Sequence, residues 1–239
     1  MILFISDLHL DRSRPGVAAA FEHFLQSRAR QSSALYILGD LFELWIGDDD
    51  DDPFSLQITD ALGQLTQQGV SLYFIHGNRD FLIGEQFARR SGATLLQQHC
   101  VIDLYGEATL LMHGDTLCTQ DQDYQRFRAQ VRAAAWQQQV LAKSLAERRA
   151  LAQQLRQQSQ TMNSRKPQDI MDVTQNEVER VMREYGVRRL IHGHTHRPAR
   201  HRFTMDGQPT ERIVLGDWEQ TAWCLQATAD GIELQQWPI

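Results

Sequence analysis

The 239-residue sequence lacks several features that define other classes of protein. No apolar run approaches the ~18 residues that a helix needs to cross a bilayer. Only three cysteines are present and they are scattered, which excludes a disulfide-rich secreted scaffold. The first residues, MILFISD, are apolar without a basic residue before them, so we expect a buried strand there and no signal peptide. Together these absences predict a cytosolic protein with reduced thiols.

Acidic residues are almost missing from one segment of an otherwise acidic chain. The net charge is −6, but residues 124–166 contain nine Lys and Arg and the single acid Glu147, a net of +8 that leaves −14 elsewhere. This asymmetry favours a local anionic partner over general nucleic-acid binding, and we expect no obligate protein partner. Gly and Pro are absent from 121–161, where Leu and Phe recur at helical spacing. We therefore predict a helical insertion over 121–166 within one domain, 1–239.

Apolar runs and helical patterns alternate through the first third of the chain. The runs ILFIS, ALYIL and VSLYFI read as strands, and helical patterns cover 17–30, 53–67 and 84–91. Strands that are apolar throughout and separated by helices predict a largely parallel sheet covered on both faces. Further strands follow at ATLLM and RRLI, and two C-terminal segments with central Asp-Gly pairs predict hairpins. The fold class is therefore α/β, arranged as a layered sandwich.

Short polar motifs follow the ends of five predicted strands. They are DLH (Asp7, His9), GD (Gly39, Asp40), HGNRD (76–80), HGD (113–115) and HGHTH (192–196). Sites in open parallel sheets form at the carboxyl ends of strands, so these loops are expected to converge. Mixed carboxylate, imidazole and amide ligands suit Mn²⁺, Zn²⁺ or Fe²⁺. One carboxylate can bridge two ions about 3.5–4 Å apart, the arrangement that hydrolyses phosphate esters.

This pattern resembles the calcineurin-like metallophosphoesterase superfamily, whose signature is DxH, GD, GNH(D/E), H and GHxH in this order. The resemblance implies a four-layer αββα sandwich in which the helical insertion is a lid. It implies one ion held by Asp7, His9, Asp40 and His196, and a second held by Asp40, Asn78, His113 and His194. Asp40 would bridge the two ions. The catalytic residues would be Asp40, Asn78, Arg79 and His194.

The third motif departs from the superfamily because it reads GNRD, with Arg79 where the pattern has histidine. An arginine cannot act as a general acid, since its pKa is too high, but it can clamp phosphate oxygens. A phosphate that leaves from a pyrophosphate is stable as an anion, whereas a leaving alkoxide needs a proton. Arg79 therefore favours pyrophosphate cleavage over the hydrolysis of simple alkyl phosphates.

Longer stretches, among them FISDLHL, WIGDDD, HGNRDFLIG and LIHGHTHRPA, resemble the UDP-2,3-diacylglucosamine diphosphatase family of lipid A biosynthesis. This resemblance implies two Mn²⁺ per chain, a glycolipid nucleotide substrate, and water attack on the α-phosphorus to give UMP and 2,3-diacylglucosamine 1-phosphate. It also implies peripheral association with the cytoplasmic side of the bacterial inner membrane. The implied substrate contacts are Asn78, Arg79, Asp121, Ser159, Asn163, Lys166 and His194.

The insertion has a physical use for such a substrate. Its apolar stripe, with Trp45, Phe81 and Leu82, would line an acyl-chain pocket, because burial is worth about 0.8 kcal/mol per CH₂. Its basic residues would meet the diphosphate or the anionic leaflet. The plainer interpretation is a solvated helix face.

Other interpretations stay open beside these. The run Asp48–Asp52 is expected to be a solvated loop that favours the following helix N-terminus, and not a metal site. His76 and His192 are expected to orient metal ligands, and GDW (216–218) to be a supporting turn. The rival functions are a soluble nucleotide or protein phosphatase of the same superfamily and a non-catalytic scaffold.

Overall fold

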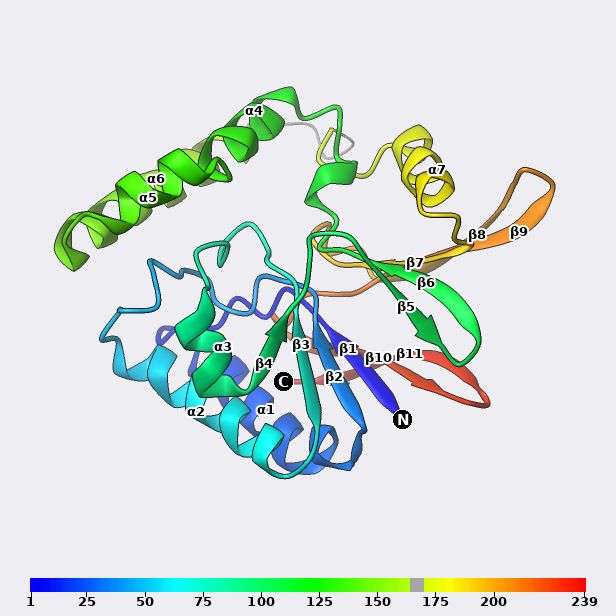
Figure 1. Cartoon of the computed structure of the whole chain (residues 1–239), viewed down its shortest axis with the longest axis horizontal. Helices are drawn as coiled ribbons and strands as arrows, with labels where there is room; N and C mark the ends of the chain where they lie inside the picture. Colours follow the sequence, from blue (N-terminus) through cyan, green and yellow to red (C-terminus); the bar gives the residue numbers. More distant parts are fainter. Residues whose placement is uncertain (164–169) are drawn as a thin grey trace.

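The computed structural model describes residues 1–163 and 170–239, with side chains for residues 1–157 and 170–239. Its strands form a six-stranded sheet in the order β11-β10-β1-β2-β3-β4 and a five-stranded sheet in the order β5-β6-β7-β9-β8 (Figure 1). The first sheet contains β1 (Ile2–Ile5), β2 (Ala34–Ile37), β3 (Ser71–Phe74), β4 (Ala93–Leu95), β10 (Thr221–Thr228) and β11 (Gly231–Pro238). The second contains β5 (Cys100–Leu104), β6 (Glu107–Leu111), β7 (Arg189–His192), β8 (Ala199–Met205) and β9 (Gln208–Val214).

Both sheets are parallel where the predicted site loops leave them. Strands β1 to β4 pair in parallel, and so do β6, β7 and β9. The antiparallel pairs are β1 with β10, β10 with β11, β5 with β6, and β8 with β9. The two predicted hairpins are confirmed. Asp206-Gly207 lies between β8 and β9, and Asp230 ends the turn between β10 and β11, whose first residue is Gly231. Asp206 and Gly207 both have positive φ, as a tight hairpin turn requires.

The helices fall into three groups around the sheets. The first group covers the six-stranded sheet and contains α1 (Pro15–Ser27), α2 (Pro53–Gln67) and α3 (Glu85–Ser91). The second lies in the predicted insertion and contains α4 (Gln122–Val131), α5 (Ala134–Leu141) and α6 (Leu145–Asn163). The third is α7 (Gln175–Glu184); the 3₁₀ turns are η1 (Ala29–Gln31) and η2 (Asp115–Leu117). Within the described ranges, no helix combines the length and apolarity that crossing a membrane requires.

Three apolar clusters fill the spaces between four layers. Strand β1 shows why, since Leu3 and Ile5 face the helices α1–α3 while Phe4 faces the other sheet. The second cluster joins the two sheets, and the third packs β7 against Val178 and Val181 of α7. The predicted four-layer αββα sandwich is confirmed. The boundary of a single domain over 1–239 remains a prediction.

Candidate metal centre

Five predicted site residues have a backbone conformation that is rare for residues with a side chain. The φ angles are +56° for Asp7, +50° for His9, +53° for Asp40, +69° for His194 and +53° for His196. Such left-handed conformations cost roughly 1–3 kcal/mol each and persist where the surroundings enforce them, often at functional sites. Each strand here therefore ends in a sharp turn that aims a ligand-type side chain at the same place.

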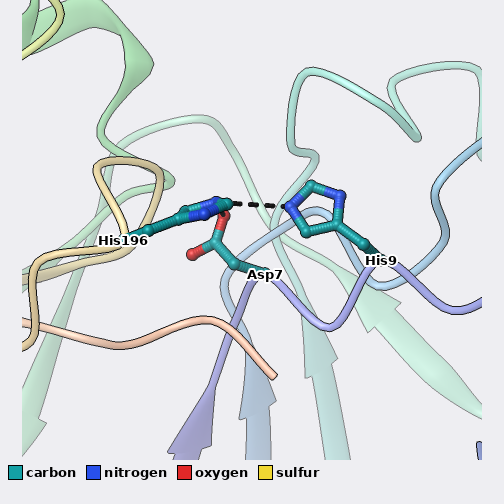
Figure 2. A group of neighbouring side chains, drawn as sticks. All are labelled: Asp7, His9 and His196. Atoms are coloured by element: carbon teal, nitrogen blue, oxygen red, sulfur yellow. Dashed lines mark hydrogen bonds and ion pairs between the residues drawn. The ribbon is translucent and has the colours of Figure 1, made fainter. Parts of the chain in front are cut away.

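Asp7, His9 and His196 bring three ligand atoms together (Figure 2). The buried Oδ1 of Asp7 has no hydrogen-bond partner among the described residues, and it lies 3.5 Å from Nε2 of His196. This Nε2 atom lies 3.3 Å from Nε2 of His9. Two ring nitrogens and an unsatisfied carboxylate oxygen that face one another form a ligand set for a divalent cation. The residues present therefore fit one of the two expected ions.

A second set surrounds the amide oxygen of Asn78. Oδ1 of Asn78 lies 2.9 Å from Nε2 of His113 and 2.8 Å from Nδ1 of His194. Nδ1 of His113 lies 2.8 Å from the Leu38 carbonyl oxygen, so this nitrogen donates and leaves Nε2 free to act as a ligand. Oδ2 of Asp40 lies 3.7 Å from the same Nε2. All four residues predicted for the second ion are therefore together.

The carboxylates of Asp7 and Asp40 lie at the junction of the two sets. Asp7 belongs both to the triad with His9 and His196 and to a triad with Asp40 and His113. Oδ2 of Asp40 lies 3.8 Å from Nε2 of His9 and 3.7 Å from Nε2 of His113, midway between one ring of each set. The geometry thus gives a central position to both aspartates. The assignment of the bridge to Asp40 remains a prediction.

Two motif glycines let the loops approach this closely. A Cβ atom on Gly77 would lie 2.1 Å from Oδ1 of Asp40, and one on Gly193 would lie 2.2 Å from Oδ2 of Asp7. Any larger residue at either position would push a site carboxylate away. The glycines of HGN and HGH are therefore required by packing.

Burial and neighbouring charges separate the protonation states of the histidines. Burial, reinforced by the positive charge of His113, lowers the pKa of His194 to about 4, so this ring is neutral near pH 7. Burial also acts to lower the pKa of His196, but the interaction with the carboxylate of Asp7 outweighs it and raises the pKa to about 9. The same interaction, acting against burial, holds the pKa of Asp7 far below its usual range. A cation that displaces the His196 proton therefore meets an ionised carboxylate.

Supporting residues hold the ligand loops. Asp80 accepts hydrogen bonds from the amides of Gly77 and Leu41 at 2.8 Å each, which joins the Asn78 and Asp40 loops. Burial, together with the charge of Asp40, raises the pKa of Asp80 to about 6. The GDW segment is a supporting turn as predicted, because the Trp218 amide donates to the Asp7 carbonyl oxygen at 3.1 Å.

The prediction that His76 and His192 contact metal ligands is wrong. His76 lies against the Ile83 carbonyl oxygen at 2.7 Å, and His192 lies 3.1 Å from Nη1 of Arg212. His76 follows the end of β3 by two residues and His192 is the last residue of β7, and each ring contacts these partners and not a ligand side chain. They stabilise the loops and do not orient ligand side chains directly.

Sequence reasoning missed two carboxylates beside the cluster. Glu43 lies with Oε2 2.9 Å from Nδ1 of His9, on the far side of the ring from Nε2. Asp217 lies 3.7 Å from Nδ1 of His196. A carboxylate in the position of Glu43 fixes the tautomer and orientation of a ligating histidine. Asp217 lies beyond hydrogen-bond distance and acts on His196 through its charge. The only sequence signal was proximity to motifs, since Glu43 follows GDLF and Asp217 belongs to GDW.

A cavity of about 260 Å³ opens beside the cluster. Its polar end includes Asn78, Arg79, Glu43 and Arg156. Its apolar wall comes from the core loops and from the insertion: Leu44, Trp45, Ile46, Phe81, Leu82, Phe127, Trp136, Val140, Leu151, Ala152 and Leu155. The predicted apolar lining is therefore confirmed for Trp45, Phe81 and Leu82. Of the predicted insertion stripe, Phe127, Leu151 and Leu155 line the cavity, whereas Val131, Leu141 and Leu145 do not.

Arg79 lies at the polar end of this cavity, near enough to the carboxylate of Glu43 for the two charges to interact. Its backbone amide donates to Oδ1 of Asp40 at 2.8 Å, which ties the residue to the cluster. Its buried Nε has no hydrogen-bond partner among the described residues. The guanidinium is thus available for an anion that reaches the cluster.

The remaining predicted substrate contacts all belong to the predicted insertion over 121–166. Asp121 caps α4, where its side chain accepts a hydrogen bond from the Tyr124 amide at 3.0 Å. Ser159 and Asn163 lie on α6, but their side chains lie outside the described residues. Lys166 lies outside the described residues altogether. These substrate contacts remain predictions.

The aspartate run, Asp48–Asp52, is not the solvated loop that we predicted. Asp48 accepts from the amides of Gly84, Gln86 and Phe87 at 2.8–3.1 Å, which caps α3. Asp52 caps α2 by accepting from the Ser55 amide at 3.1 Å, so the expected stabilisation of this helix is confirmed. The partners of Asp48 lie more than 30 residues away, which is why local sequence did not reveal them.

The three central aspartates bind the insertion. Asp49 pairs with Arg148, and both Asp50 and Asp51 pair with Arg149. Nearer the site, Arg128 pairs with Asp115 at 2.6 Å. These arginines were predicted to face solvent, a diphosphate or a membrane. They instead hold α4 and α6 onto the core.

Comparison with known proteins places this geometry in context. Residues 1–198 match the family model of the calcineurin-like phosphoesterases. The chain is 58% identical over 237 residues to a UDP-2,3-diacylglucosamine hydrolase of Cellvibrio japonicus, covering 99% of each chain. It is 52% identical over 238 residues to the UDP-2,3-diacylglucosamine hydrolase of Pseudomonas aeruginosa strain UCBPP-PA14, covering 100% of this chain and 99% of that one. A solved archaeal phosphodiesterase superposes with a TM-score of 0.51 at 12% identity, covering 100% and 99% of the two chains, and shows the shared fold.

Proposed function

The chain belongs to the calcineurin-like phosphoesterase family, and we propose that it is a Mn²⁺-dependent hydrolase that cleaves the pyrophosphate bond of UDP-2,3-diacylglucosamine. The family and the two ligand sets together imply a dinuclear metal site. The two hydrolases named above, similar over their full length, support the substrate. In the proposed reaction a water oxygen bonds to the α-phosphorus while the bond from that phosphorus to the bridging oxygen breaks. The products are UMP and 2,3-diacylglucosamine 1-phosphate.

The observation that carries this proposal is the apolar cavity that opens beside the ligand cluster. A glycolipid nucleotide needs a centre that cleaves phosphate bonds and, next to it, a surface that shelters acyl chains. Trp45, Phe81 and Leu155 provide such a surface within the same cavity as Asn78 and Arg79. Each sheltered CH₂ contributes about 0.8 kcal/mol to binding. A phosphatase for soluble nucleotides or for proteins would have no use for this lining.

Two bound Mn²⁺ would supply an activated water and neutralise charge on the phosphoryl oxygens. The residues of the chain do the rest. Arg79 would bind the pyrophosphate through its guanidinium, whose buried Nε has no hydrogen-bond partner among the described residues, and would stabilise the leaving phosphate as an anion. Asn78 would place its amide beside the same oxygens, and neutral His194 would keep a lone pair directed at the centre. No side chain need donate a proton to this leaving group, which suits an arginine in the third motif.

The proposed substrate also determines where the protein would act. Its acyl chains hold it in a membrane while its nucleotide lies in water. We therefore propose peripheral association with the cytoplasmic side of the bacterial inner membrane, without a nucleic-acid partner. An obligate protein partner is not required by the proposed reaction.

Hydrolysis assays in isotopically labelled water test the proposal. The purified protein should release UMP from UDP-2,3-diacylglucosamine when Mn²⁺ is present and lose this activity when Mn²⁺ is chelated. UDP-glucosamine without acyl chains, the matched control substrate, should react far more slowly. The label should appear in UMP. Equal rates on the two substrates would contradict the acyl-chain pocket, and label in the sugar phosphate would contradict attack on the α-phosphorus.

A further inference from the structure

The cavity beside the cluster has two ends of different chemistry, and α6 runs between them. Arg156 lies at the end that holds Asn78 and Arg79, whereas Arg148 lines the cavity two turns earlier on the same helix. A separation of eight residues corresponds to about 12 Å along a helix axis. Ala152 and Leu155 line the wall between these two positions. An acyl chain that extends from the cluster along α6 would therefore end at Arg148.

The guanidinium of Arg148 is held from several directions. Its Nη1 donates to the Ile46 carbonyl oxygen at 2.8 Å and to Oδ1 of Asp49 at 2.6 Å. Its Nε donates to the Lys143 carbonyl oxygen at 3.1 Å, and its Nη2 donates to the second oxygen of Asp49. The side chain is only 3% exposed. The head group therefore forms a fixed polar wall, and its stem faces the apolar cavity.

The neighbouring backbone is shaped around this head group. Gly47 has a φ of +132°, and a Cβ atom there would lie 2.4 Å from Nη1 of Arg148. Solvent lies beyond the wall, since the side chain of Asp49 is 57% exposed and Leu141 is 43% exposed. An apolar chain can pass this point only by breaking a charge pair that it cannot replace. The wall is thus a single side chain between a lipid-like cavity and water.

We propose that Arg148, held by Asp49, sets the maximum acyl-chain length that the cavity accepts. This inference rests on the proposed function and makes Arg148 a specificity-determining residue of that reaction. Arg149 separates this role from simple attachment of the insertion. Arg149 lies on the same turn of α6 as Arg148 and pairs with Asp50 and Asp51, but it does not line this cavity. The aspartate run would then hold the insertion through Arg149 and define the depth of the pocket through Arg148.

The test compares Arg148→Ala with the matched control Arg149→Ala. Each variant is assayed on a series of UDP-diacylglucosamine substrates with acyl chains of increasing length. One methylene too many in an apolar pocket costs roughly tenfold or more in kcat/KM. Arg148→Ala should remove this decrease and raise the ratio of kcat/KM for long chains over short chains by about tenfold. Arg149→Ala should keep the wild-type length profile. An unchanged profile in Arg148→Ala, or the same shift in Arg149→Ala, would overturn the inference.

A second variant keeps the test informative if Arg148→Ala does not fold. Arg148→Met retains an apolar stem but ends short of the guanidinium position, so it should shift the profile in the same direction by less. A wild-type profile in this variant would also overturn the role of Arg148. Failure of the wild-type protein to hydrolyse any acylated substrate would instead overturn the proposed function. The two failures are therefore distinguishable.

Discussion

The ligand cluster and the insertion face the same cavity, but different forces hold them in place. The cluster lies between two sheets, with Asp7 and Asp40 almost fully buried and five residues in strained conformations. The insertion is a set of helices that lie across the core loops (Figure 1), attached by arginines to carboxylates at the surface. The chemistry therefore depends on ligand loops that are packed rigidly at the ends of the strands. Substrate fit depends on a layer that ion pairs can hold or release.

The largest expected effect comes from removing a central carboxylate of the cluster. Asp40→Ala should lower kcat/KM by more than the roughly 10–100-fold that loss of an outer partner of a metal ligand costs. It should also reduce the number of Mn²⁺ bound per chain, measured by electron paramagnetic resonance. Asp51→Ala removes the same charge from the aspartate run and should bind Mn²⁺ normally. Full Mn²⁺-dependent activity in Asp40→Ala would show that the dinuclear assignment is wrong.

Arg79→His tests whether the third motif selects the leaving group. The change removes a guanidinium at the cavity and should lower kcat/KM for the diphosphate substrate by about a hundredfold. Activity on simple alkyl phosphates should rise relative to it, because histidine can protonate an alkoxide. The matched control is Arg89→His, on the exposed face of α3. If Arg79→His keeps both activity and substrate preference, the argument from the leaving group fails.

Glu43→Gln tests whether the two regions are coupled. One oxygen of Glu43 lies 2.9 Å from Nδ1 of His9, and the other lies 3.0 Å from Nε of Arg156 on α6. The substitution should lower Mn²⁺ affinity by roughly 10–100-fold, because His9 loses its orienting partner. Isothermal titration calorimetry measures this without reference to activity. Glu85→Gln, at an exposed position on α3, is the control. Unchanged affinity would mean that cluster and insertion are independent.

The smallest effect is expected at the end of the aspartate run, where Asp52 caps α2 and pairs with the exposed Arg12. Asp52→Ala removes the N-cap of α2 and should lower the free energy of unfolding by about 1 kcal/mol, measured by urea denaturation. Activity should not change, because Asp52 belongs neither to the ligand cluster nor to the lining of the cavity beside it. Asp51→Ala removes an exposed partner of Arg149 and should destabilise the fold less. Equal losses in both variants would contradict separate roles for neighbouring aspartates.

The sequence by itself determined the frame of strands and the place where the candidate ligand residues gather. Strands that are apolar throughout must be buried in a sheet, and polar residues directly after them must gather where parallel strands end. The loops were expected to converge for this reason, and the resemblance to the phosphoesterase superfamily implied the ligand set. Its members lie together in the structure: Asp7, His9, Asp40, Asn78, His113, His194 and His196. The Asp-Gly hairpins and the Pro53 helix start were equally local signals.

Only the tertiary structure decided which partners the other charges have. The aspartate run looked solvated in sequence, yet Asp49 meets Arg148 from 99 residues away. Glu43 became a partner of His9 only because the second loop folds beside the first. Hydrophobic periodicity is read within one element, whereas the choice of an ion-pair partner depends on how separate elements pack. The same packing places Leu151 and Leu155 of the basic helix α6 in the wall of the cavity.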